Sequence, residues 1–92
     1  MNQYGAQAQR HWRTHLPARY RALTDPEAFF GEMGEQIAEQ VQQVAKDLAG
    51  PDPAGESYLD KVGRLNMARL TAEAQVLRET LPAPESDAQN TP

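Results

Sequence analysis

The sequence predicts an all-α protein, built as a helical hairpin of two long antiparallel helices plus an N-terminal kinked helical arm. Apolar residues recur every three or four positions in two long segments, which is the period of helices with one buried face. A loop rich in proline and glycine separates these segments. A chain of 92 residues has room for one domain. We place this domain at residues 1–81.

The helix predicted over residues 26–49 has signals at both ends. Asp25 can cap its N-terminus, and Pro26 is favoured at the first helical position. Gly50 and Pro51 favour its end. Its large apolar side chains form one narrow stripe: Phe30, Met33, Ile37, Val41, Val44 and Leu48. Small residues flank this stripe, so a neighbouring helix can approach closely: Gly34, Ala38 and Ala45.

Residues 50–56 are predicted to form the loop of the hairpin, because two prolines and two glycines in seven residues support no regular element. Ser57 can cap a second helix over residues 57–80. The apolar arc of this helix is wider than about 100°, more than a seam with one other helix requires. It comprises Tyr58, Leu59, Val62, Leu65, Leu70, Val76, Leu77 and Leu81. We therefore expect two neighbours: the first long helix, and either the arm or a second copy of the chain.

The arm spans residues 4–24 and is less regular. Its apolar side chains repeat every fourth position until Pro17 kinks the helix or starts a new turn: Tyr4, Ala8, Trp12 and Leu16. Residues 82–92 contain three prolines and show no periodicity. They are predicted to be a disordered tail.

The net charge of −4 conceals a strong segregation along the chain. Residues 1–24 carry four arginines and no acid, whereas residues 25–60 carry nine acids and one lysine. Opposite charges in separate segments favour docking of the basic segment on the acidic one, within a chain or between two chains.

Composition excludes several classes of chemistry and location. A chain without cysteine has no disulfide, no thiolate zinc site and no cysteine nucleophile. No stretch approaches the about 18 apolar residues of a membrane span, and the N-terminus lacks the apolar core of a signal peptide. We expect a cytoplasmic protein that does not contact membranes.

Two clusters of polar residues are candidates for a catalytic or metal site. His11 and His15 lie one helical turn apart, a spacing at which two imidazoles can share a metal, but their segment supplies no third ligand. Glu32, Glu35 and Glu39 lie on the face away from the apolar stripe, whereas catalytic carboxylates need an enclosing pocket. The sequence therefore predicts no enzyme activity, no metal site and no cofactor.

The expected function is association with proteins. The chain has more large apolar side chains than a two-helix seam can bury, which favours a non-catalytic protein–protein interaction or adaptor module that forms a homodimer. The expected interface residues are Trp12, Tyr20, Phe29, Phe30, Met33, Leu65, Leu70 and Val76.

Nucleic-acid binding is the alternative function. The arm interleaves aromatic residues with arginines that could neutralise phosphates: Arg10, Arg13, Arg19 and Arg21. In this interpretation the protein is an accessory of a phage or mobile element.

One resemblance covers residues 4–48. It rests on Trp12, Leu16-Pro17, Arg19-Tyr20, Asp25-Pro26, Phe29-Phe30 and Gly34-Glu35. This pattern resembles uncharacterised small helical proteins of high-GC actinobacteria and of their phages or mobile elements. The resemblance implies no activity, cofactor or site residue.

Overall fold

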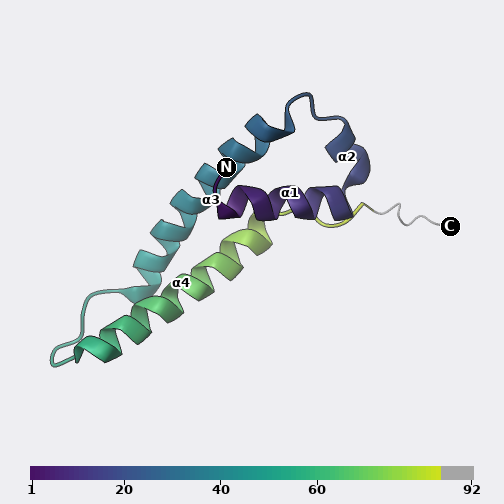
Figure 1. The fold of residues 1–92 in the computed structure, drawn as a ribbon. Coiled ribbons are helices and arrows are strands. Elements are labelled where there is room, and N and C mark those ends of the chain that lie inside the picture. Colours follow the sequence, from purple (N-terminus) through teal and green to yellow (C-terminus); the bar gives the residue numbers. More distant parts are fainter. Residues whose placement is uncertain (86–92) are drawn as a thin grey trace.

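The computed structural model describes residues 1–85, which form four helices and their connections (Figure 1). The helices are α1 (Gln3–His15), α2 (Pro17–Arg21), α3 (Pro26–Ala49) and α4 (Tyr58–Thr80). No strand occurs in residues 1–85, which confirms the predicted all-α class. None of these four helices is long and apolar enough to cross a membrane.

The two long helices, α3 and α4, pack side by side as an antiparallel hairpin (Figure 1). Helix α1 crosses the open end of this hairpin and packs mainly on α3, and α2 turns the chain back toward the start of α3. The arm therefore packs against one end of the hairpin, and the loop lies at the opposite end.

The ends of the helices follow the local signals of the sequence. The side chain of Asp25 accepts a hydrogen bond from the backbone N–H of Ala28 at 3.1 Å. The Ser57 hydroxyl accepts from the backbone N–H of Asp60 at 3.1 Å. Gly50 ends α3 with a φ of 65°, a backbone conformation that favours glycine. The predicted caps and boundaries of both long helices are confirmed to within one residue.

The core consists of two clusters. One joins α1 to both helices of the hairpin: Tyr4, Ile37, Val41, Ala72 and Val76. The other lies between the arm and the beginning of α3: Ala8, Trp12, Leu16 and Phe30. Helix α1 contributes side chains to both clusters, so its position on α3 determines how both clusters pack.

Helix α1 reaches α3 at a contact between two glycines, Gly5 and Gly34. A Cβ atom built on Gly34 would lie 2.8 Å from the Gly5 nitrogen and 2.9 Å from its Cα. The Asn2 side chain caps α1 at the Gly5 N–H and also donates to the Gly34 carbonyl at 2.9 Å. The close approach predicted for the flank of α3 is therefore present at Gly34.

Two cations of α4, Arg64 and Lys61, bind the loop of the hairpin. The Arg64 guanidinium binds the carboxylate of Glu56 at 2.7 Å, that of Asp52 at 2.8 Å and the carbonyl of Ala49. Lys61 contacts Asp52 at 2.7 Å. These cations lower the pKa of Asp52 and of Glu56 below their ordinary values.

The segment after α4 corrects the predicted boundary of the disordered tail. Residues 82–85 run along the arm, where the Glu85 N–H donates to the His15 carbonyl at 2.8 Å. The Glu85 carboxylate accepts hydrogen bonds at 3.2 and 2.9 Å from the otherwise unpaired backbone N–H groups in the first turn of α2, those of Ala18 and Arg19. These long-range bonds order residues 82–85. The rest of the predicted tail, residues 86–92, lies outside the described part of the chain.

Replacing Gly34 by alanine tests the close crossing of α1 and α3. The added methyl group would overlap the Gly5 backbone, so we expect Gly34→Ala to lower the free energy of unfolding by about 1–3 kcal/mol. Gly31→Ala is the matched control on the same helix, because its Cβ would meet nothing within 4 Å. Alanine has the higher helix propensity, so the control should stabilise the protein slightly. Urea unfolding followed by circular dichroism measures both, and equal stabilities of the two variants would contradict this crossing.

Replacing Arg64 by alanine tests the tie between the loop and α4. Groups whose pKa is lowered by folding stabilise the protein above their unfolded pKa values, and this stability is lost as pH falls through the lowered folded values. The difference in Tm between the wild type and Arg64→Ala should therefore be largest near pH 7 and shrink below about pH 4. Arg10→Ala is the control, since Arg10 makes no salt bridge within residues 1–85. A difference in Tm that does not change with pH would contradict the role of the two carboxylates.

Candidate protein interface

Most of the exposed large apolar side chains belong to α4. Five of the seven within residues 1–85 lie on this helix, which therefore presents apolar side chains to solvent as well as to α3: Tyr58, Leu59, Leu65, Met67 and Leu70. Single exposed leucines are ordinary on protein surfaces, but contiguous apolar surface marks contact sites.

Several of them lie in one row with two small residues, which we call the outward stripe: Leu59, Gly63, Met67, Leu70 and Ala74. The row advances by four, four, three and four positions and so follows one face of the helix. The buried face of α4 consists of Ala68, Ala72 and Val76. At about 100° of rotation per residue, the outward stripe and the buried face are on opposite sides of α4.

The outward stripe is open to solvent along its length. The exposed fractions are 78% for Leu59, 63% for Met67 and 61% for Leu70, and Gly63 and Ala74 are exposed as well. Helix α3 covers the opposite face of α4, and α1 packs mainly on α3. The arm meets α4 through Tyr4, which packs on Ala72 and Val76, and within residues 1–85 no element covers the stripe.

A charged residue lies beside each end of the outward stripe. Asp60 is in the first turn of α4, and Arg78 is in the last turn. Their separation of 18 residues is about five helical turns, so both lie along the same flank of the stripe. Neither makes a salt bridge with another residue of the segment 1–85.

The structure corrects part of the predicted interface. Three of its residues are buried within the single chain and belong to the core: Trp12, Phe30 and Val76. Three more are half-buried at the edges of the same core: Tyr20, Phe29 and Met33. Leu65 and Leu70 are exposed, at 41% and 61%, so these two residues retain the surface that an interface requires.

The aromatic residues are buried because the arm folds back over the start of α3. The Trp12 ring meets Phe29 and Phe30 edge to face, with centroids 5.1 and 5.6 Å apart. Tyr20 stacks on Phe30 at 6.0 Å, and the Arg19 guanidinium lies 4.8 Å from the centre of the Trp12 ring. Such ring pairs add to the energy of apolar burial, so this cluster holds the arm to the hairpin.

The basic side chains of the arm do not dock on acids within the described chain. Four arginines are exposed on α1 and α2: Arg10, Arg13, Arg19 and Arg21. None of them forms a salt bridge within residues 1–85, and the glutamates of α3 are exposed too: Glu32, Glu35 and Glu39. The predicted docking of basic on acidic segments is thus not found inside this part of the chain.

The two histidines do not form a metal centre with other described residues. The rings of His11 and His15 are 4.9 Å apart between centroids. The Nε2 atom of His11 lies 2.8 Å from the carbonyl oxygen of Pro82, so this nitrogen donates a hydrogen bond. Across residues 1–85, no three histidine, cysteine or acidic side chains converge as metal ligands. The pair instead lies beside the segment that runs back along the arm.

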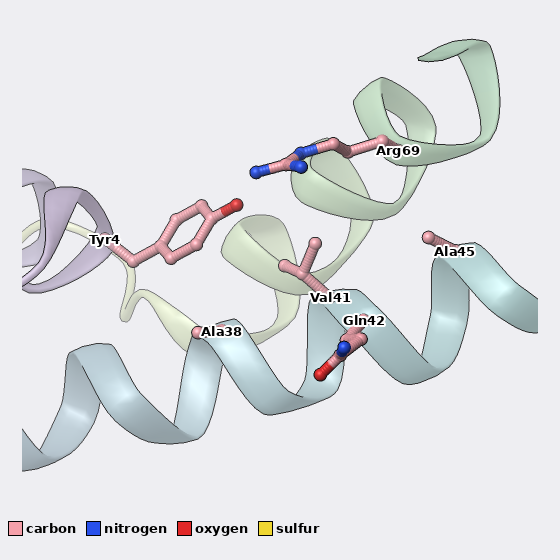
Figure 2. A pocket seen from close by; sticks show the side chains of 6 residues that line it. All are labelled: Tyr4, Ala38, Val41, Gln42, Ala45 and Arg69. Carbon is pink, nitrogen blue, oxygen red and sulfur yellow. The ribbon is translucent and has the colours of Figure 1, made fainter. Parts of the chain in front are cut away.

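A hollow of about 290 Å³ lies where α1 meets the hairpin (Figure 2). Its walls are Tyr4, Ala38, Val41, Gln42, Ala45 and Arg69. Figure 2 shows Tyr4 and Arg69 approaching each other above Val41. The Tyr4 hydroxyl donates to the Glu73 carboxylate at 2.5 Å, and Arg69 Nε is 3.5 Å from the same oxygen. Burial and this bond raise the pKa of Tyr4, so it remains a donor at neutral pH and contributes no base.

The predicted interface residues do not include two exposed residues of the outward stripe, Leu59 and Met67, although Leu59 belongs to the predicted apolar arc. The signal was present as steps of three and four positions from residue 59 to residue 74. Gly63 and Ala74 obscured it, because small residues contribute little to an apolar pattern even where they share a face with large ones.

Comparison of this chain with protein-family models, with curated proteins and with solved structures found no match.

Proposed function

We propose that this protein is a non-catalytic protein–protein interaction or adaptor module that forms a homodimer, with the outward stripe of α4 as its contact surface. One observation carries this proposal: α4 is apolar on two opposite sides, and α3 covers only one of them. Action in the cytoplasm is part of the same proposal and is supported by the cysteine-free composition.

Removing Leu59, Met67 or Leu70 from water contributes about 1–2 kcal/mol each, because each is still well over half exposed. Gly63 and Ala74 add little area but let a partner helix approach the backbone of α4. The stripe therefore has the composition of a helix-packing surface.

Polar substitutions in the centre of the stripe test the proposal. We expect the wild type to change from monomer to dimer with concentration in sedimentation velocity runs between about 1 and 100 μM. The double variant Met67→Gln, Leu70→Gln should dissociate at least tenfold more easily, since about 1.4 kcal/mol of lost burial is a tenfold change.

The control for this experiment is Tyr58→Gln. Tyr58 is 79% exposed and is also on α4, but it points away from the outward stripe. This variant should dimerise like the wild type, and circular dichroism should show equal helix content in all three proteins. A wild type that remains monomeric up to 100 μM would refute the homodimer.

A second candidate function is nucleic-acid binding by the arm, as an accessory protein of a phage or mobile element. It is favoured by the four arginines of α1 and α2, which are exposed and make no salt bridge within residues 1–85. Exposed guanidinium groups that form no salt bridge can bind phosphates directly.

Fluorescence anisotropy with labelled DNA and RNA distinguishes this candidate. Binding through the arm should weaken steeply between 50 and 200 mM salt, and the quadruple variant Arg10→Ala, Arg13→Ala, Arg19→Ala, Arg21→Ala should abolish it. Lys46→Ala, which removes an exposed cation from α3, should leave binding almost unchanged. Absence of binding at 50 mM salt would end this candidate.

A further inference from the structure

We infer that the partner of α4 is the α4 helix of a second copy, packed antiparallel so that Met67 lies against the partner's Leu70 and Gly63 against the partner's Ala74. This inference rests on the proposed function and specifies its partner, direction and register. It is carried by the symmetry of the outward stripe and of the charges beside it.

Four of the five residues of the outward stripe are symmetric about one point, and the fifth, Leu59, has Arg78 as its counterpart. Met67 and Leu70 are equally far from a point between residues 68 and 69, and Gly63 and Ala74 are equally far from the same point. A twofold rotation through this point therefore places large side chains against large ones at the centre and small against small on either side. Two such faces would meet along about 20 Å of helix.

The flanking charges determine the direction of the two helices. Asp60 and Arg78 are symmetric about residue 69, within one residue of the point between residues 68 and 69, and lie along the same flank. In an antiparallel pair each Asp60 therefore meets the partner's Arg78, once at each end. A parallel pair brings the two Asp60 residues to one end and the two Arg78 residues to the other, so it gains no such attraction. Antiparallel helices also align their dipoles favourably.

The symmetry favours a second copy over an unrelated protein. An unrelated partner needs no relation between the two ends of the stripe, whereas a twofold contact requires each end to complement the other. Asp60 and Arg78 meet this requirement, and within residues 1–85 neither is engaged in a salt bridge. The dimer is then a row of four helices, in which the two α4 helices lie in the middle and the two α3 helices outside.

Cysteine pairs test the register, because the native chain contains no cysteine. In the predicted dimer of the variant Gly63→Cys, Ala74→Cys, position 63 of each copy faces position 74 of the other, within the distance that a disulfide spans. Gly63 has open space around its Cβ position, and Ala74 is exposed, so the fold should accept both changes. Mild oxidation should convert this variant to a covalent dimer.

The single variants Gly63→Cys and Ala74→Cys test whether the two α4 helices are antiparallel. In the antiparallel dimer, Cys at position 63 is about 16 Å from its own symmetry mate, as is Cys at position 74, so neither single variant should cross-link. The matched control is Glu32→Cys, Gln43→Cys, whose positions are also eleven residues apart and exposed, but on α3. It measures cross-linking by random collision and should form little covalent dimer.

The outcomes separate this inference from the proposed function. Cross-linking of the double variant alone supports the antiparallel register. Efficient cross-linking of either single variant overturns it in favour of a parallel pair. A wild type that sediments as a dimer while the double variant stays uncross-linked overturns the register but leaves the homodimer intact. A wild type that is monomeric throughout overturns both.

Charge exchange provides a test that does not depend on cysteine. Asp60→Lys and Arg78→Glu should each weaken the dimer at least threefold, since each replaces two attractions by two repulsions. The double variant should recover most of the wild-type affinity, because the pairs are restored with reversed signs. Additive weakening in the double variant would overturn the predicted contact between these residues.

Discussion

The crossing of α1 over α3 is the constraint on which the rest of this structure depends. It is possible because Gly5 and Gly34 bring two backbones together without side chains between them, and Asn2 bridges the helices at the same place. From this contact α1 runs along α3 and inserts Trp12 and Leu16 beside Phe30. The turn at Pro17 then returns the chain to the beginning of α3, and the segment after α4 runs along the outside of the arm. One close helix contact thus organises both core clusters.

The same crossing explains why α4 retains an apolar face in solvent. Among the described helices, α1 packs mainly on α3 and meets α4 through Tyr4. Among residues 1–85, helix α4 therefore has a full neighbour on the side of Ala68 and Ala72 and none on the side of Met67 and Leu70. A small domain buries a low fraction of its surface, so the exposed apolar side of a helix with two apolar sides is most simply buried by another chain.

The position of the arm also explains the charge distribution. The contact between α1 and α3 is made by glycine, asparagine and aromatic residues, so the arginines of the arm are left on its outer surface and do not reach the glutamates of α3. The acids that do form salt bridges act locally, as Asp52 and Glu56 do when they hold Arg64 beside the loop. Charge segregation in the sequence therefore creates two exposed surfaces of opposite sign and does not bring them together inside the described chain.

The sequence by itself determined the helices and their ends, because caps, proline positions and apolar periods act over a few residues. Asp25, Ser57 and Gly50 have the roles that their positions predict. Only the tertiary structure decided which apolar side chains are buried: Trp12, Phe30 and Val76 became core, whereas Leu59 and Met67 remained outside. It also ordered residues 82–85, through hydrogen bonds to residues more than sixty positions away. The physical reason is that an apolar repeat shows only that a helix has apolar faces to bury. The angle at which other helices pack on it determines which of those side chains are covered.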